Sequence, residues 1–410
     1  MSGAHLARRA DFRYLIIGGG MACDAAARGI RQLDADGSIG IIADEEDPPA
    51  IRPALTKKLW TDPEFTFDRV WLHTEEQTGA YRRGRERAQE LNRSDRVVLT
   101  SSGAEYGYQH LLIATGASPR RIDLPDDERI IYFRSAEDYR RLRALCDHGR
   151  RIAVVGGGFI GTELAAALVH NGIDTTLVFP EPTLCGAVFP TRLAERFQHL
   201  FATAGVRLIP NTVVEHGTAD AAAVTLLLDE SGEVDADAVV LGLGVAPNSA
   251  IAEHAGLRIN GGIVVDDRLR TDDDNVWAAG DVASYPDRIL GRTRVEHVDN
   301  ARAMGTQAGR NLAGADEPYD HTPYFYSVVF GNRYEAVGRL DSSLQTVEHW
   351  SDDDAGVVYY LDGDRVAGVL LWNVHGQLDA ARATIAQGAT IRLDDLAARI
   401  PLTPDRRSAA

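Results

Sequence analysis

Cysteine is scarce in this chain, and the few cysteines present lie far apart. Cys23, Cys146 and Cys185 are the three cysteines among 410 residues, and no two of them form a CxxC or CxxxxC pair. Closely spaced cysteine pairs carry thiol–disulfide exchange, so the pattern gives no support for a disulfide relay and suits a reducing compartment. We therefore expect a cytoplasmic protein whose cysteines are small, mostly buried side chains.

Long apolar runs and positive charge are also lacking. No run approaches the roughly 18 residues of a membrane-spanning helix, and roughly a dozen N-terminal residues carry arginines but no signal-peptide core. Lysine and arginine number 43 against 60 aspartates and glutamates, a formal net charge of −17. This excess argues against nucleic acid and anionic membranes as partners. The twelve histidines form no ligand-spaced cluster with cysteine or acid, so we expect no metal.

Three consecutive glycines occur in two short segments with similar surroundings. Strands expected at 14–17 and 38–43 flank a helix over about 21–33, and a second such unit has strands at 151–155 and 175–179 around a helix at 162–171. Each first strand runs directly into three consecutive glycines. Two such strand–helix–strand openings predict two Rossmann-like domains.

Each glycine turn has the residues that dinucleotide binding requires. The first glycine permits the tight bend, and the second lets the backbone approach a pyrophosphate at the helix N-terminus. These positions are Gly18 and Gly20 in the first turn, with Cys23 in the third position, and Gly156, Gly158 and Gly161 in the second. Asp44 and Glu181 follow the second strand of each unit, where a carboxylate binds ribose hydroxyls and repels the 2′-phosphate of NADPH. Glycine turns also open helices that bind nothing, but two matching units favour two dinucleotides, usually FAD and NADH.

The remaining segments complete three domains. Further strands are expected at 88–100 as a meander, at 111–114, at 224–228 and 239–243 within the second unit, near Val276, and at 336–347, 357–361 and 366–372. Helices are expected from about Asn300 and over 378–387. We predict an α/β protein with an FAD-binding domain at 1–122 and 249–322, an NAD-binding domain at 123–248, and a C-terminal α+β domain at 323–410.

Other motifs resemble one known family. Ala114-Thr115-Gly116-Ala117 and Gly242-Leu243-Gly244-Val245 resemble the crossovers between a flavin domain and an inserted NAD domain, and Ala279-Gly280-Asp281-Val282 resembles a second FAD motif. The chain is similar in these motifs to pyridine nucleotide–disulfide reductases. Arg52-Pro53-Ala54-Leu55-Thr56-Lys57, Arg294-Val295-Glu296-His297 and Tyr334-Glu335-Ala336-Val337-Gly338 resemble the apoptosis-inducing factor group and, more distantly, bacterial ferredoxin reductases.

The resemblance implies roles for particular residues. Lys57 would point toward N5 of the flavin and pair with Glu163, where its positive charge would stabilise the reduced flavin. Arg52 and Arg120 would contact FAD phosphates or the adenosine side, and Asp281 the ribityl chain. The other implied cofactor-binding residues are Thr115, Gly116, Gly244, Gly280, Glu296, His297 and Tyr326. Of these, His297 would be catalytic with Lys57 and Glu163.

The chain departs from the family in three places. The long insertion of the animal proteins is absent between about Val347 and Val357. We expect neither the import peptide nor the membrane anchor of those proteins. Tyr326 replaces the tryptophan of an aromatic pair beside the flavin. Val264 and Asp273 stand where arginines of the family's NADH-induced dimer would be expected, which leaves a homodimer open but not by that route.

Three functions remain open from the sequence. The first is an apoptosis-inducing-factor-like NADH oxidoreductase that passes electrons directly from FAD to a quinone, oxygen or a small redox protein. The second is an NADH-dependent ferredoxin or rubredoxin reductase, for which Arg82, Arg83, Arg85 and Arg87 offer a local basic patch. The third is a binding module with a structural FAD. Turnover with a panel of acceptors distinguishes them.

Overall fold

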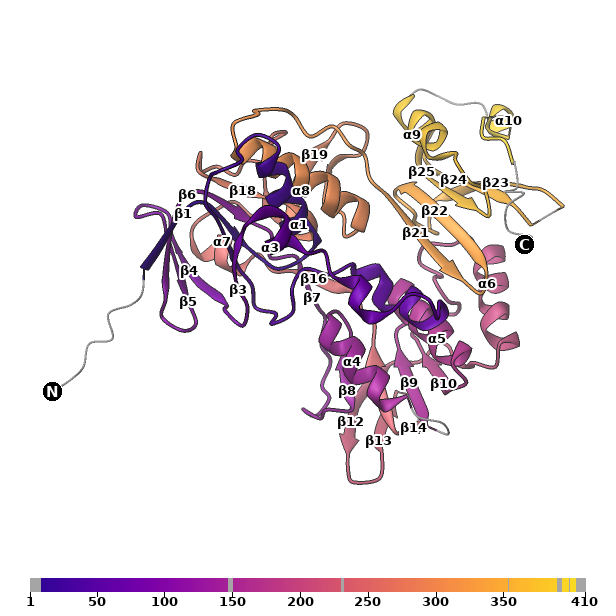
Figure 1. Cartoon of the computed structure of the whole chain (residues 1–410). Helices are drawn as coiled ribbons and strands as arrows, with labels where there is room; N and C mark the ends of the chain where they lie inside the picture. Colours follow the sequence, from indigo (N-terminus) through magenta and orange to yellow (C-terminus); the bar gives the residue numbers. More distant parts are fainter. Residues whose placement is uncertain are drawn as a thin grey trace. The chain divides into compact units, whose positions relative to one another are not determined.

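The computed structural model describes residues 9–146, 150–229, 232–352, 354–388, 393–397 and 399–402 (Figure 1). Residues 1–52, 68–118 and 246–323 form one compact unit, here unit 1, and residues 53–67, 119–245 and 324–410 form unit 2. The three-domain division remains a prediction from the sequence. Within the described residues, no helix is long and apolar enough to cross a membrane.

Unit 1 is built on one large sheet. Its strands are ordered β3-β2-β1-β6-β5-β4, and β18 pairs with β6. The bounds are β1 (Arg9–Ile17), β2 (Ile39–Ile42), β3 (Tyr81–Arg83), β4 (Ala88–Asn92), β5 (Val97–Thr100), β6 (Glu105–Ile113) and β18 (Val276–Ala278). β1, β2, β3, β6 and β18 pair in parallel, whereas β4 and β5 pair antiparallel. The second half of β1, Tyr14–Ile17, is buried, as expected of a parallel strand covered on both faces.

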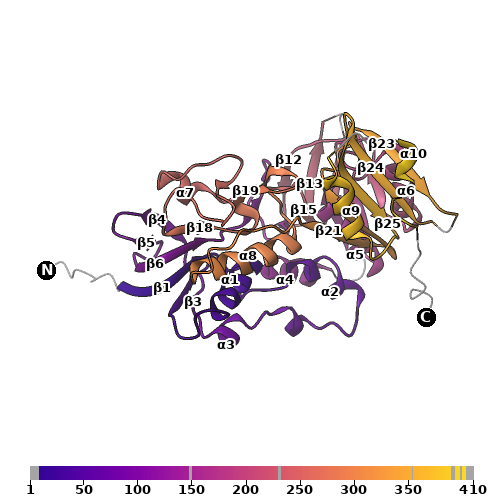
Figure 2. The same ribbon diagram turned by 90° about the horizontal axis from the view of Figure 1, so that it is seen from above.

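Helices α1 (Met21–Arg31) and α8 (Val298–Leu312) lie side by side in unit 1 (Figure 2). The contact is close because small residues line it: a Cβ on Gly309 would lie 2.0 Å from the Ala26 carbonyl oxygen. The unit also contains η1 (Arg52–Leu55, continuing into unit 2), η2 (Phe67–Val70), α3 (Thr74–Thr78), α7 (Ala250–His254), η3 (Gly280–Val282), and a small sheet of β17 (Ile263–Val264), β19 (Ala283–Asp287) and β20 (Gly291–Thr293). The chain passes between the units at β7 (Ala117–Pro119) and β16 (Val245–Pro247).

Unit 2 contains the second Rossmann-like sheet, in the parallel order β11-β10-β9-β15-β8. Its strands are β8 (Ile130–Tyr132), β9 (Arg151–Val155), β10 (Asp174–Val178), β11 (Arg207–Ile209) and β15 (Ala238–Leu241), with helices α2 (Lys58–Thr61), α4 (Ala136–Leu145), α5 (Phe159–His170) and α6 (Thr191–Thr203). The predictions of a strand at 224–228 and of its place within the second unit are confirmed, but the strand lies outside the Rossmann-like sheet. That segment is β13, in an antiparallel sheet with β12 (Val214–Ala219) and β14 (Gly232–Ala236).

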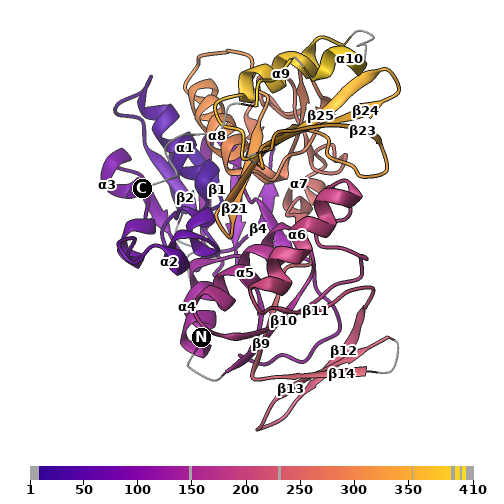
Figure 3. The ribbon, with the colours of Figure 1, turned by 90° about the vertical axis from the view of Figure 1, so that its right-hand side faces the viewer.

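The C-terminal part of unit 2 is an antiparallel sheet in the order β21-β22-β25-β24-β23. Its strands are β21 (Tyr324–Val329), β22 (Asn332–Gly338), β23 (Gln345–Trp350), β24 (Gly356–Asp362) and β25 (Arg365–Trp372). Helix α9 (Leu378–Ala386) packs on β22 and β25, and the short α10 (Leu393–Leu396) follows (Figure 3). The predicted single strand at 336–347 is wrong, because a turn in which Ser343 donates to the Asp341 carboxylate divides it into β22 and β23. Two Rossmann-like sheets and an α+β part confirm the predicted fold class.

Candidate functional site

The first glycine turn, in unit 1, has the shape that a pyrophosphate requires. Gly18 has φ +128°, and a Cβ there would lie 2.1 Å from the Ala114 carbonyl oxygen, so only glycine fits. Gly20 begins α1 with no side-chain cap, which leaves N–H groups at the helix N-terminus for an anion. The Arg52 guanidinium lies 3.8 Å from the Cβ position of Gly20 and pairs with Glu45. These residues fit the diphosphate of a dinucleotide.

Asp44, the carboxylate predicted for the ribose, follows β2 in unit 1. Its Oδ2 lies 3.1 Å from Nη2 of Arg87, and both side chains are largely exposed. An exposed ion pair contributes at most about 1 kcal/mol, so Arg87 would yield to a ribose that offered two hydroxyl donors. Asp44 therefore fits its predicted role despite this partner.

The crossover residues are joined by reciprocal hydrogen bonds within unit 1. The Thr115 hydroxyl donates to the Asn248 carbonyl at 2.8 Å, and the Asn248 amide returns a bond to the Thr115 carbonyl at 3.0 Å. The Asn248 backbone N–H also donates to the Gly116 carbonyl. In unit 2, the Arg120 backbone N–H donates to the Gly244 carbonyl, while the Arg120 side chain is exposed. Thr115 thus ties the two crossovers together.

The second predicted FAD motif forms a connected group in unit 1. Gly280 has φ +77°, and Asp281 beside it is buried. Arg294 donates to the Asp281 carbonyl at 3.0 Å and to the Glu296 carboxylate at 2.5 Å. Glu296 is exposed, and Arg294 links its carboxylate to the backbone carbonyl of Asp281.

His297 precedes α8 and is neutral at physiological pH. Burial lowers the pKa of His297 to about 4, against smaller opposing effects of the Asp281 and Asp299 carboxylates. A neutral imidazole can accept one hydrogen bond and donate another. His297 could therefore hold a cofactor or substrate group but would not supply a positive charge.

The second glycine turn, in unit 2, repeats the geometry of the first. Gly156 has φ +114°, and a Cβ there would lie 2.5 Å from the Gly242 carbonyl oxygen. Nothing lies within 4 Å of the Cβ position of Gly158, at the start of α5, so the backbone is open to a ligand. A Cβ on Gly161 would lie 1.8 Å from the Gly156 oxygen, so this glycine permits the close helix–strand contact. Among the described residues, none forms an ion pair with the side chain of Glu181, which leaves it available to ribose hydroxyls.

Lys57 and Glu163 meet in unit 2, although 106 positions separate them in sequence. Lys57 Nζ lies 2.6 Å from Glu163 Oε2, and the Glu163 side chain is only 5% exposed. α2, which follows Lys57, packs against α5, which carries Glu163 near its N-terminus. The structure therefore has the ion pair that the resemblance implies.

Two hydroxyl groups complete the surroundings of Glu163. Thr56 Oγ1 donates to Oε2 at 2.6 Å, and Ser327 Oγ donates to Oε1 at 2.6 Å. Tyr326, the residue before Ser327, lies with its ring centroid 5.9 Å from Lys57 Nζ and 4.7 Å from the Arg333 guanidinium. The Lys57–Glu163 centre thus has an aromatic neighbour and two neutral donors.

Cys185 lies close to this centre, nearer than its sequence position indicates. Burial raises the pKa of the Cys185 thiol above its ordinary value; a hydrogen bond with Thr162 opposes this, and the charges of Glu163 and Glu181 add to it. Burial likewise raises the pKa of Tyr334, with smaller contributions from Cys185 and Glu163. Both groups are neutral, and a protonated, buried thiol is a poor nucleophile.

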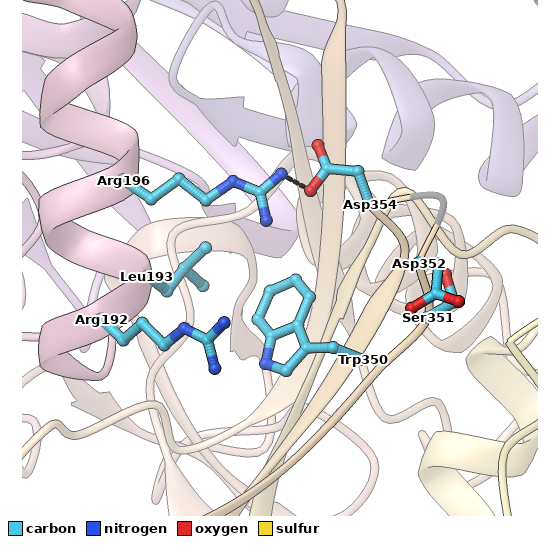
Figure 4. Close-up of a pocket in the computed structure, with 7 residues that line it drawn as sticks. All are labelled: Arg192, Leu193, Arg196, Trp350, Ser351, Asp352 and Asp354. Atoms are coloured by element: carbon cyan, nitrogen blue, oxygen red, sulfur yellow. Dashed lines mark ion pairs between the residues drawn. The ribbon is translucent and has the colours of Figure 1, made fainter.

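A pocket of about 300 Å³ lies elsewhere in unit 2, between α6 and the end of β23 (Figure 4). Arg192, Leu193 and Arg196 face Trp350, and Arg196 forms an ion pair with Asp354. The Arg196 guanidinium also lies over the rings of Trp350 and Trp372, at 5.6 and 5.9 Å. None of the predicted site residues lines this pocket, and its contacts join α6 to the C-terminal sheet.

Several site residues were missed in the sequence. Thr56 and Ser327 contact Glu163, Glu45 holds Arg52, and Asn248 holds Thr115. Asn248 lies three residues after the second crossover motif, and Thr56 and Ser327 each adjoin a predicted residue. Their position next to a predicted residue was the available signal. Serine and threonine are so common in turns that this position alone does not indicate a site residue. The described residues contain no group of three His, Cys, Asp or Glu that could hold a metal ion.

The two Rossmann-like sheets, each with a glycine turn and an acidic residue after its second strand, define an FAD-dependent NAD(P)H oxidoreductase fold. Residues 12–305 match the family of pyridine nucleotide-disulphide oxidoreductases, and residues 308–355 match the C-terminal family of mitochondrion-associated apoptosis-inducing factor. The chain belongs to the pyridine nucleotide-disulphide oxidoreductase family, and its cofactors are FAD and NAD(H).

Similar proteins include apoptosis-inducing factors and ferredoxin reductases. The chain is 34% identical, over 93% of its length and 79% of the relative's, to mitochondrial apoptosis-inducing factor 1 of Dictyostelium discoideum. It is 33% identical, over 92% of its length and 94% of the relative's, to the ferredoxin–NAD(+) reductase component of the anthranilate 1,2-dioxygenase system of Burkholderia cepacia. Among solved structures, a ferredoxin reductase for the CYP199A2 system from Rhodopseudomonas palustris has a TM-score of 0.84 and 27% identity, and the match covers 94% of this chain and 97% of that one.

Proposed function

We propose that the protein transfers a hydride from NADH to FAD and then passes the electrons directly to an external acceptor, in the manner implied by its resemblance to the apoptosis-inducing factor group. The observation that carries this proposal is the buried Lys57–Glu163 ion pair, 2.6 Å between Nζ and Oε2. A lysine ammonium beside a flavin favours the form that carries extra negative charge. Glu163 offsets part of that positive charge and holds the ammonium in place.

The binding roles divide between two sets of residues. In unit 1, Gly18, Gly20 and Arg52 would hold the FAD diphosphate, Asp44 the ribose, and Asp281 the ribityl chain. In unit 2, Gly156 and Gly158 would hold the NADH diphosphate and Glu181 the ribose. The side-chain roles of Lys57, His297 and Tyr326 at the flavin are proposals that rest on the resemblance.

Direct transfer, without a thiol step, is supported by the state of two cysteines. Cys23 and Cys185 are buried, and burial raises the pKa of each thiol. A thiol relay needs a thiolate at neutral pH and a second sulfur to form a disulfide. Cys23, Cys146 and Cys185, which all lie in the described part of the chain, form no disulfide with one another.

The second candidate is a ferredoxin or rubredoxin reductase, which the relative from Burkholderia cepacia favours by its name. The predicted basic patch does not support it. Arg85 pairs with Glu46, Arg87 with Asp44 and Arg83 with Glu86. An acidic partner would meet three arginines whose charge is already matched, whereas Arg82, the fourth, donates to backbone carbonyls. Quinone, oxygen and small redox proteins therefore remain the acceptor classes to test.

A stopped-flow experiment tests the proposal. The purified protein, mixed with NADH without oxygen, should lose its visible flavin absorbance as the bound FAD is reduced. Ferricyanide, a quinone and a ferredoxin are then compared as acceptors. A variant with Cys23, Cys146 and Cys185 all changed to Ser should turn over like the wild type. Selective loss of its turnover with FAD still bound would contradict direct transfer, and failure of NADH to reduce the wild-type flavin would refute the oxidoreductase proposal.

Location and assembly remain proposals from the sequence. A cytoplasmic location rests on the small number and wide sequence spacing of the cysteines. The homodimer stays open, and Asp273, which stands where the family's dimer would have an arginine, instead accepts an ion pair from Arg93 at 2.8 Å. Sedimentation of the protein with and without NADH tests for a dimer.

A further inference from the structure

The Glu163 carboxylate accepts three bonds of equal length. Lys57 Nζ and Thr56 Oγ1 each lie 2.6 Å from Oε2, and Ser327 Oγ lies 2.6 Å from Oε1. Thr56, Ser327 and Glu163 are all buried. A single cation with two neutral donors therefore surrounds one buried carboxylate.

The two hydroxyls come from segments far apart in the chain. Thr56 lies 107 positions from Glu163, and Ser327, on β21, lies 164 positions away. A hydroxyl has one proton to donate, and in each case the structure directs that proton at Glu163. Because one donor binds each carboxylate oxygen, the two hydrogen bonds fix the orientation of the Glu163 carboxylate plane relative to Lys57.

The donors also affect the balance of charge. A hydrogen bond donated to a carboxylate stabilises its negative charge and draws part of it toward the donor. Less of that charge is then available to offset the ammonium of Lys57. Removing a hydroxyl should make Glu163 hold Lys57 more strongly and leave less positive charge exposed to a neighbouring group.

We propose that Thr56 and Ser327 are positioning residues that set how strongly Glu163 offsets the charge of Lys57, and through it the reduction potential of the bound flavin. The proposal rests on the proposed function, because it takes Lys57 to lie at the flavin. Its sign is definite: loss of either hydroxyl lowers the potential, whereas loss of the Glu163 charge raises it.

The test measures flavin potentials of the FAD-bound protein by equilibration with a reference dye. Thr56→Val and Ser327→Ala should each reduce the equilibrium constant for flavin reduction by about tenfold, which is about 30 mV for two electrons. Glu163→Gln should shift it in the opposite direction. Thr56→Ser and Ser327→Thr keep the hydroxyl and should return the potential toward the wild-type value.

A matched control is Thr175→Val in β10. Thr175 is buried and donates to the Ile173 carbonyl at 2.9 Å, so this variant also loses a buried hydroxyl bond, but not one to Glu163. Its potential should equal that of the wild type. Unchanged potentials in Thr56→Val and Ser327→Ala, with lower stability only, would overturn the proposal and make both residues structural. A wild-type protein without FAD, or a Lys57→Met variant with an unchanged potential, would instead refute the proposed function and the inference with it.

Discussion

Replacing Lys57 by Met should destabilise unit 2 strongly, because it leaves Glu163 as a buried charge without its cation. Removing one partner of a buried ion pair costs about 3–5 kcal/mol. The lower end applies here, since Thr56 and Ser327 still donate to the carboxylate and the Lys57 side chain is 16% exposed, which lets water reach the vacated position. The expected loss is about 3 kcal/mol, or roughly a hundredfold in the opening equilibrium.

Hydrogen exchange of the FAD-bound protein measures this loss of stability in the helices of unit 2 that hold the ion pair. Amides in α5, which carries Glu163, and in α2, which packs against it, should exchange roughly a hundredfold faster in Lys57→Met. The double variant Lys57→Met with Glu163→Gln should recover much of the protection, because no uncompensated charge remains. The two single changes should therefore be strongly non-additive.

Lys58→Met supplies the control, because it removes the neighbouring lysine, which is exposed and lies over the ring of Phe65. Its effect should stay within about 0.5 kcal/mol. If Lys57→Met costs no more than Lys58→Met, or if the double variant equals the sum of the single ones, the argument for a buried, coupled pair is refuted.

Three further predictions follow from other residues. Gly18→Ala should yield a folded protein that does not retain FAD, because its Cβ would lie 2.1 Å from the Ala114 carbonyl oxygen; absorbance and circular dichroism check this. NADH should be preferred to NADPH by roughly a hundredfold in kcat/KM, since Glu181 meets the 2′-phosphate with like charge, and equal efficiencies would contradict this. Stability should fall as pH drops from 6.5 to about 4, because the unfolded chain takes up a proton that folded His297 does not. The free energy of unfolding, measured with urea at each pH in this range, should depend less on pH in His297→Gln than in the wild type.

The sequence predicts the two Rossmann-like units well because their strands are short apolar runs that end in glycine. β9 occupies residues 151–155 as predicted, and β1 ends at the residue before Gly18. The apolar runs do not reveal which strands they pair with. The run at 224–228 has the composition of a buried strand, but pairing depends on contacts from distant segments, and here it pairs with β12 and β14.

In the candidate site, too, the sequence identified key residues but not all of their partners. The resemblance identified Lys57 and Glu163, and the structure brings them within 2.6 Å. It did not identify Thr56 and Ser327 as partners of that pair, because their role depends on two separate segments delivering one proton each to the same carboxylate. Motifs name the residues whose chemistry is unusual, whereas ordinary hydroxyls become informative only when their acceptor is known.

The predicted basic patch shows why counting charges along the sequence misleads. Arg82 donates to the carbonyls of residues 45 and 46, and its three neighbouring arginines pair with acids of the segment after β2 or with Glu86. Exposed pairs contribute at most about 1 kcal/mol each, so they would not by themselves prevent a partner from docking. What they remove is the long-range field that steers an acidic protein into place. Reduction of an acidic ferredoxin through this surface should therefore depend only weakly on salt. We expect no steep decrease in its rate as the ionic strength rises from about 0.01 M to about 0.1 M, over which the Debye length shortens from roughly 30 Å to roughly 10 Å. A steep decrease would show that the surface steers an acidic partner after all, or that a second basic surface does so.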